Sequence, residues 1–144
     1  MAFALTITAF ADGSPVKNDQ GAGKGMTIFN SEDKLIARVP ASSVKKVMPS
    51  RAYRLDDDDK EAFLDAYEQA KNVEDKVVRA CYWLDIPEKY KDLEDFAYAK
   101  YEFSSRGKNV QLTVNGKEME VVSLGSGMYY AKLTEFGTIV ITSD

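Results

Sequence analysis

The chain of 144 residues has no histidine and only one cysteine, Cys81, and these two absences exclude several kinds of chemistry. No imidazole is present to act as a general base, and zinc sites built from cysteine and histidine would have too few ligands. A single thiol forms no internal disulfide, which favours a reducing, cytoplasmic compartment. No segment approaches the roughly 18 consecutive apolar residues of a membrane span, so we expect no membrane partner.

What the chain does contain is the composition of a compact globular protein. Hydrophobic residues make up 44% of the chain and charged residues 29%. This balance provides enough apolar surface for a buried core. Chains of this length commonly fold as one unit. We therefore predict a single domain that spans residues 1–144.

The first part of the chain reads as a strand followed by a loop. Residues 3–10 alternate as a strand does, and residues 11–25 are rich in glycine. Within this loop, residues 21–25 (GAGKG) resemble the core of the phosphate-binding loop of P-loop nucleoside monophosphate kinases. Asn18 stands where that motif opens with glycine, and Gly25 stands where it has a hydroxyl residue. We therefore interpret the segment as a hairpin loop.

A hairpin and a short helix are expected next. Residues 26–29 and 35–39 are rich in apolar and β-branched side chains and flank a polar turn, which predicts two paired strands. Ser42 or Ser43 is expected to cap a short helix that ends at Met48.

The middle of the chain shows helical spacing from Asp56 onward. The apolar residues that share one stripe are Phe63, Ala66, Tyr67 and Ala70, continued by Val77, Cys81 and Leu84. We expect residues 57–86 to form one helix or two, and residues 88–103 to form another. The acidic run Asp56–Asp59 lies where carboxylates stabilise a helix N-terminus, which favours a capping role for it.

The last third is typical of antiparallel strands. Asn115-Gly116 is a strong two-residue hairpin signal, because both residues tolerate positive φ. The expected register sets Val114 opposite Lys117, Leu112 opposite Met119, and Val110 opposite Val121. Together these patterns predict an α+β fold with N-terminal strands, a central acidic helical block of two to three helices and a C-terminal four-stranded antiparallel meander.

Charge is divided unevenly along the sequence. Residues 1–54 carry eight basic residues and four acidic ones, whereas residues 55–102 carry seven basic residues and fifteen acidic ones. The leading hypothesis is a non-enzymatic, intracellular interaction protein that binds a protein partner with a basic surface. A small virus-encoded inhibitor of a host enzyme is one protein of this kind. The acidic residues expected to make this contact are Asp65, Glu68, Glu74, Asp75, Asp92, Glu94 and Asp95.

Two other functions are open alternatives. A nucleic-acid-binding protein would use the basic segment of residues 45–54, whose cations and aromatic ring are Lys45, Lys46, Arg51, Tyr53 and Arg54. A structural subunit that assembles into homo-oligomers is the other alternative. We predict no catalytic residue, metal site or cofactor, because no residue spacing selects one and Cys81 falls among apolar residues.

Overall fold

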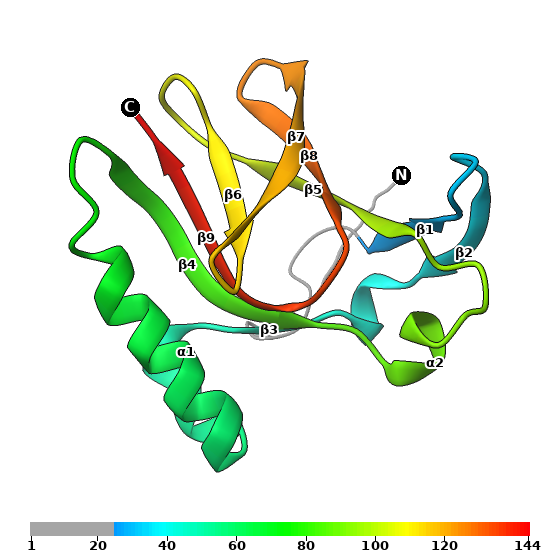
Figure 1. Ribbon diagram of the computed structural model, residues 1–144, viewed down its shortest axis with the longest axis horizontal. Helices are drawn as coiled ribbons and strands as arrows, with labels where there is room; N and C mark the ends of the chain where they lie inside the picture. The colour runs from blue at the N-terminus through cyan, green and yellow to red at the C-terminus, as the bar shows by residue number, and fades with distance from the viewer. Residues whose placement is uncertain (1–24) are drawn as a thin grey trace.

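The structure, a computed structural model, describes residues 25–144, which form one curled sheet with a single long helix on its outside (Figure 1). The nine strands of this part of the chain are β1 (Met26–Phe29), β2 (Leu35–Val39), β3 (Lys45–Val47), β4 (Val77–Asp85), β5 (Tyr98–Ser104), β6 (Gln111–Val114), β7 (Lys117–Gly125), β8 (Met128–Leu133) and β9 (Gly137–Ser143). Its helices are α1 (Asp57–Ala70), the four-residue α2 (Glu88–Lys91), and the 3-10 helices η1 (Ala41–Ser43) and η2 (Pro49–Arg54).

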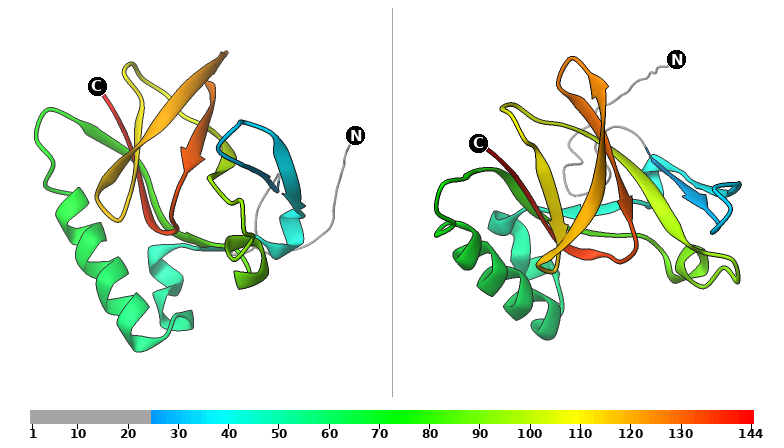
Figure 2. Two further views of the ribbon diagram at one scale, coloured as in Figure 1. Left: turned by 45° about the vertical axis from the view of Figure 1, so that its right-hand side comes forward. Right: turned by 45° about the horizontal axis from the view of Figure 1, so that its top comes forward.

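All neighbouring strands are antiparallel, in the order β2-β1-β5-β8-β7-β6-β9-β4-β3. β7 joins the two halves of the sheet, because residues 117–119 pair with β6 and the residues from Glu120 onward pair with β8. This change of partner within one strand accompanies a strong curl, so that the two halves face each other (Figure 2).

The main core lies inside the curl. Ile28, Ala99 and Ala131 come from one half of the sheet, Leu84 and Ile139 come from the other, and all five are fully buried in a single cluster. Because successive side chains of a strand point to opposite faces, the residues between them lie on the outside of the curl. Burial of this apolar surface, at roughly 25 cal/mol per Å², is what holds the two halves together.

A second, smaller core lies on the outside of the sheet, where α1 packs on β4 and β9. Phe63 of α1 is fully buried there, in a cluster with Cys81 and Trp83 of β4 and Leu55 at the end of η2. β4 is therefore covered on both faces, by the inner core on one side and by α1 on the other.

Three predictions of local structure are confirmed. β1 and β2 form the expected hairpin over the expected residues. The Asn115-Gly116 turn joins β6 to β7 with Val114 opposite Lys117, as predicted. α1 begins at Asp57, and the side chain of Asp56 caps it by accepting a hydrogen bond of 2.9 Å from the backbone N–H of Asp59.

The predicted α+β fold class, with its central acidic helical block of two to three helices, is wrong beyond residue 70. Residues 77–85 form β4 instead of a helix. The strand was missed because residues 81–84 are buried on both faces and lack the polar alternation that marks a strand. Residues 88–103 contain only the short α2, followed by β5. In β5 the inward residues Ala99, Tyr101 and Phe103 alternate with polar ones. This period of two is that of a strand, and the segment forms a strand instead of the expected helix.

The predicted four-stranded meander is also wrong, in its last strand. β6, β7 and β8 are consecutive neighbours, but β9 pairs with β6 and β4 instead of β8. Gln111 accordingly lies opposite Thr142 of β9. The expected pair of Val110 with Val121 is absent from the register of β6 and β7, because Val121 pairs with Ala131 of β8. The choice of partner for β9 is a long-range one, which hairpin signals do not report.

The short helix expected to end at Met48 is replaced by other structure. η1 takes only residues 41–43, and β3 follows it because Val47 and its neighbours pair with the end of β4. The expected strand over residues 3–10 and nearly all of the loop over residues 11–25 lie outside the described residues. Gly25, at the boundary, is packed so closely that a Cβ atom there would lie 1.9 Å from the carbonyl oxygen of Val39.

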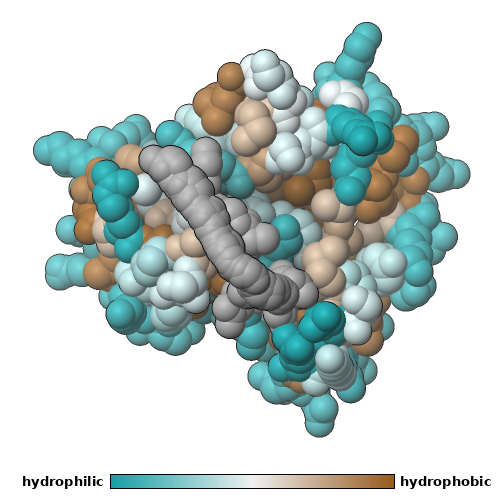
Figure 3. Space-filling model, turned by 180° about the vertical axis from the view of Figure 1, so that it is seen from behind, coloured by the Kyte–Doolittle hydropathy of each residue, from teal (hydrophilic) through white to brown (hydrophobic). Residues whose placement is uncertain are grey.

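Apolar residues on the surface of residues 25–144 are dispersed. The large exposed ones come from different elements, for example Leu35 of β2, Val77 of β4 and Leu124 of β7. From behind, the molecule shows separate brown patches between hydrophilic residues (Figure 3). No helix in the described residues is long and apolar enough to cross a membrane.

Removal of the α1 cap gives a first testable prediction. Asp56→Ala should lower the free energy of unfolding by about 1 kcal/mol, because the N–H of Asp59 loses its acceptor. Asp56→Ser keeps an acceptor oxygen and should retain most of the stability. Urea unfolding followed by circular dichroism measures both variants, and equal losses for alanine and serine would contradict the capping role.

Candidate functional site

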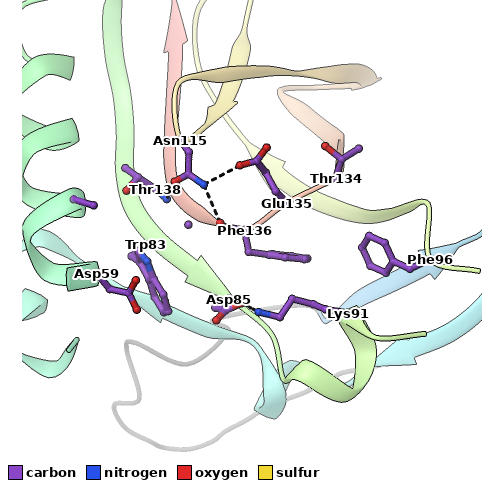
Figure 4. A pocket seen from close by; sticks show the side chains of 12 residues that line it. Asp59, Trp83, Asp85, Lys91, Phe96, Asn115, Thr134, Glu135, Phe136 and Thr138 are labelled. Atoms are coloured by element: carbon purple, nitrogen blue, oxygen red, sulfur yellow. Dashed lines mark hydrogen bonds and ion pairs between the residues drawn. The ribbon is translucent and has the colours of Figure 1, made fainter. Parts of the chain in front are cut away.

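A hollow of about 670 Å³ opens where the start of α1, the end of β4 and the corner between β8 and β9 meet (Figure 4). We call it the acidic hollow. Its charged residues are Asp59, Asp85, Glu135 and Lys91, its aromatic residues are Trp83, Phe96 and Phe136, and its other lining residues are Ala62, Asn115, Thr134, Gly137 and Thr138. These residues come from six separate parts of the chain, so only the folded sheet brings them together.

The side chain of Asn115 fixes one wall of the acidic hollow. Its Oδ1 accepts a hydrogen bond of 2.9 Å from the N–H of Thr138, and its Nδ2 donates to Oε1 of Glu135 and to the carbonyl oxygen of Phe136, both at 3.0 Å. The backbone N–H of Asn115 also donates to the carbonyl oxygen of Thr138 at 2.9 Å. The turn between β6 and β7 is thereby clasped to the start of β9 (Figure 4).

Gly137 makes this clasp possible. Its φ of 143° is one that other residues rarely adopt, and a Cβ atom at this position would lie 2.3 Å from Oδ1 of Asn115. The close approach of the Asn115 side chain therefore requires glycine at the first residue of β9.

Two of the three carboxylates in the hollow already have partners. Asp85 accepts hydrogen bonds of 2.8 Å from the N–H of Ile86 and from Nζ of Lys91. Burial lowers the pKa of Lys91, but the hydrogen bonds and charges of Asp85 and Glu88 outweigh burial, so that its pKa is raised overall. Lys91 is therefore held as an ammonium ion at the floor of the hollow.

Glu135 is stabilised as a carboxylate. Its pKa is lowered, first by the hydrogen bond from Asn115 and then by the one from Lys117, and burial opposes them weakly. Nζ of Lys117 lies 3.0 Å from its Oε2. Glu135 therefore contributes a fixed acceptor and little uncompensated charge.

Asp59 is in the opposite situation. Its pKa is raised by partial burial, by the charge of Asp56 and a hydrogen bond to it, and by the charges of Asp85 and Asp58. Within residues 25–144, no lysine or arginine forms an ion pair with the acidic run Asp56–Asp59. The mouth of the acidic hollow thus carries negative charge that the described part of the chain leaves uncompensated.

Aromatic side chains form the remaining walls. Trp83 is nearly buried on the outer face of β4, whereas Phe96 and Phe136 are half-buried. The ring of Phe136 already faces a cation, with Nζ of Lys91 at 5.8 Å from its centroid. Carboxylates beside aromatic faces suit a cation that also has apolar surface.

The acidic residues predicted to bind a partner are not on one helical surface. Asp65 and Glu68 lie on α1, and Glu74 and Asp75 lie in the turn after it. The other three, Asp92, Glu94 and Asp95, lie between α2 and β5, on the opposite side of the molecule from α1 (Figure 1). All seven are exposed, and Glu68 forms an ion pair of 3.2 Å with Lys71.

The basic segment of residues 45–54 does not form one stripe either. Lys45 lies over the Trp83 ring outside the sheet, at 5.4 Å, whereas Lys46 lies over the Tyr82 ring at 4.2 Å, where burial lowers its pKa. The other three residues belong to η2. Of these, Arg54 lies over the ring of Tyr53 at 5.9 Å, and Arg51 is half-buried.

A larger groove of about 820 Å³ runs between α1 and the outer face of β6 and β9. Its walls are mostly small or neutral side chains, such as Ala66, Gln69 and Thr113, with one acid, Asp65, and one amine, Lys76. This groove is more apolar than the acidic hollow, but it lacks the convergent charges that give the smaller hollow a defined chemistry.

Reactive and metal-binding groups are scarce in the described part of the chain. Residues 25–144 contain no group of three or more acidic or cysteine residues arranged to hold a metal ion. Cys81 is buried beneath α1, and burial raises the pKa of its thiol to about 11. The thiolate, which is the nucleophilic form, is therefore strongly disfavoured.

Sequence reasoning missed Asp85, Lys91, Glu135 and the aromatic residues as parts of one site. Their separation along the chain left no local motif to detect. The only available signal was the acidic run Asp56–Asp59, which was interpreted as a helix cap. That interpretation holds for Asp56, while Asp59 of the same run lines the hollow.

Comparisons with protein-family models, with curated proteins and with solved structures each found no match to this chain.

The Asn115 clasp gives a second prediction. Asn115→Gly keeps the positive φ of the turn but leaves the buried N–H of Thr138 without an acceptor, which should lower the free energy of unfolding by about 2 kcal/mol. Ser126→Gly is the matched control, because Ser126 also has positive φ in a hairpin turn. Its stability should change by less than about 0.5 kcal/mol in the same urea titration. Similar losses in both variants would refute the clasp.

The opposite pKa shifts of Asp59 and Glu135 give a third prediction. The raised pKa of Asp59 means that the folded protein loses stability as pH rises from the ordinary aspartate range through the raised value. The lowered pKa of Glu135 means that the folded protein gains stability as pH rises through the ordinary glutamate range. Relative to wild type, Asp59→Asn should therefore become more stable with rising pH, and Glu135→Gln less stable.

Unfolding free energies measured in urea from acidic to neutral pH test both signs. Stability differences that do not change with pH, or that change in the same direction for both variants, would show that the charges are not arranged as described.

Proposed function

We propose that this protein is a non-enzymatic interaction module that receives a cationic side chain of a basic protein partner in the acidic hollow. The observation that carries the proposal is the uncompensated charge of Asp59, which lines a hollow of about 670 Å³ together with three aromatic residues. This keeps the basic partner expected from the sequence but replaces the helical contact surface with a hollow built from helix, strand and corner.

Electrostatics supports a cation over an anion or a neutral ligand. Asp59 of the acidic run lines the hollow, and its pKa is raised first by burial and then by the nearby carboxylates of Asp56, Asp85 and Asp58. A cation bound near Asp59 would relieve that repulsion, so its binding should lower the pKa of Asp59 and strengthen as pH rises through that pKa. An anion would add to the repulsion.

The aromatic walls favour a lysine or arginine side chain over a metal ion. Both side chains combine a charged head with an apolar stem, and a stem of this kind packs well on Trp83 and Phe136. A guanidinium also stacks on aromatic faces, which makes arginine the better match. A partner with an exposed arginine among other basic residues therefore fits the hollow.

The proposal extends to what the contact with a basic partner would do and where it would take place. An inhibitor would act by covering the basic surface of its target, and a virus-encoded inhibitor is one form that the proposal takes. A cytoplasmic location belongs to the proposal as well, because the single thiol, Cys81, is kept buried and reduced.

The alternatives have less support from the geometry. For nucleic acid, Lys45 and Lys46 point to opposite sides of β3, so that no continuous cationic groove tracks a phosphate backbone there. For self-assembly, the exposed apolar residues of residues 25–144 are dispersed and form no broad patch.

A fluorescence titration tests the proposal. Trp83, the only tryptophan of the chain, lines the acidic hollow and reports on its occupancy. A hexa-arginine peptide should change its emission saturably, and Asp59→Asn should weaken binding about fivefold, the effect of losing roughly 1 kcal/mol of an exposed ion pair. Binding to the wild type should strengthen as pH rises through the Asp59 pKa.

Asp75→Asn is the matched control, because it removes the same charge beyond the other end of α1, a helix about 20 Å long. Non-specific attraction to an acidic protein would be reduced equally in both variants. The proposal fails if Asp75→Asn weakens binding as much as Asp59→Asn, or if the Trp83 signal does not saturate.

A further inference from the structure

A second hollow, of about 590 Å³, lies at the opposite end of β4 from the acidic hollow. It is lined by Val78, Arg79, Ala80, Ser104, Ser105, Arg106, Ser126 and Gly127, and we call it the arginine pocket. Its walls are the start of β4, the end of β5 and the turn between β7 and β8, which lie at the top of the ribbon view (Figure 1). Val78 and Trp83 of β4 are five residues apart, so the two hollows are separated by about 17 Å along the strand.

Arg79 is held in place by a buried partner. Its Nε donates a hydrogen bond of 2.8 Å to Oγ of Ser143, and Ser143 is fully buried. Gly107 lies close to both of these side chains, since a Cβ atom at this glycine would lie 2.2 Å from Oγ of Ser143 and 2.9 Å from a terminal nitrogen of Arg79. This hydrogen bond holds Nε of an otherwise exposed side chain, so part of its conformational freedom is already lost before a ligand arrives.

The other polar groups of the pocket are donors without a competing acid. Arg106 forms no ion pair with any carboxylate of residues 25–144. The lining contains three serine hydroxyls and no aspartate or glutamate. The turn around Gly127 is itself fixed, because the N–H of Ser105 donates to the carbonyl oxygen of Gly127 at 3.0 Å.

We propose that the arginine pocket binds the terminal phosphate group of a small phosphorylated ligand. Guanidinium groups present paired N–H donors that match the oxygens of a phosphate, and two of them compensate the charge of its dianion. The hydroxyls of Ser104 and Ser126 supply further donors, whereas the hydroxyl of Ser105 already donates to the carbonyl oxygen of Arg106 at 3.1 Å. A hollow of about 590 Å³ also has room for a small group attached to the phosphate.

This site is independent of the acidic hollow in position and in charge. The acidic hollow concentrates carboxylates around Asp59, and the arginine pocket contains none. A phosphate ligand would therefore be repelled by the first and attracted by the second. The same protein is able to hold a basic partner at one end and a phosphorylated ligand at the other.

The test is a titration followed by NMR of the backbone N–H signals of Ser105 and Gly127, which line the pocket and are present in every variant. Inorganic phosphate, a hexose monophosphate and a short oligonucleotide without terminal phosphates serve as probes. The monophosphate should bind at millimolar concentration or tighter, and Arg106→Gln should weaken its binding about tenfold, as expected for the loss of a charge-assisted hydrogen bond. Arg38→Gln, which removes an exposed arginine of β2, is the matched control and should bind within about twofold of wild type.

A second variant keeps the test decisive if an arginine contributes to folding. Arg79→Lys keeps the positive charge but removes the paired N–H donors of the guanidinium, whose Nε is held by Ser143. It should weaken binding of the monophosphate while circular dichroism shows an unchanged fold. Equal weakening by Arg38→Gln and Arg106→Gln, or no saturable shift with either phosphate probe, would overturn the proposal. Tighter binding of the oligonucleotide than of the monophosphate would also overturn it, in favour of a nucleic-acid backbone.

Discussion

The hydrogen bonds of the Asn115 side chain are the constraint on which the arrangement of this molecule depends. β9 must leave the end of β8 and run between β6 and β4, so its first residues need an anchor on the far side of the curl. Asn115 supplies that anchor through Thr138, Glu135 and the carbonyl group of Phe136. One amide in a hairpin turn thereby fixes the corner between β8 and β9, places Glu135 and Phe136 in the acidic hollow, and aligns the central strand of the second half of the sheet.

The clasp also shows how far local sequence reasoning reaches. The Asn-Gly pair was recognised as a turn because of its backbone preferences, and the register beside it is confirmed. The side chain of Asn115, however, acts on residues twenty or more positions later, and no local pattern indicates that. The predicted meander failed for the same reason, since it assigned β9 to its neighbour in sequence instead of the strand to which Asn115 ties it.

A different physical cause explains why the central helices were mispredicted. α1 was predictable because its apolar stripe has only one buried side and Asp56 caps it. β4 is covered by the inner core on one face and by α1 on the other, so that Tyr82 and Trp83 are both buried and the alternation of a half-exposed strand is lost. The acidic hollow was out of reach from sequence for a third reason, because its charged residues are separated by up to 76 positions between Asp59 and Glu135.

The acidic run Asp56–Asp59 shows how one short segment can stabilise a helix and also contribute to the proposed binding site. Negative charge at the start of α1 is favourable for the helix, because unpaired N–H groups and the helix dipole lie there. The fold then partly buries Asp59 and places it near Asp56 and Asp85, which raises the pKa of Asp59 and makes its ionised form less favourable. The helix dipole offsets part of this repulsion, and a bound cation would offset the rest. In the proposed interaction a basic partner would relieve this electrostatic repulsion at the mouth of the hollow, and stability and affinity would then be coupled through the ionisation of Asp59.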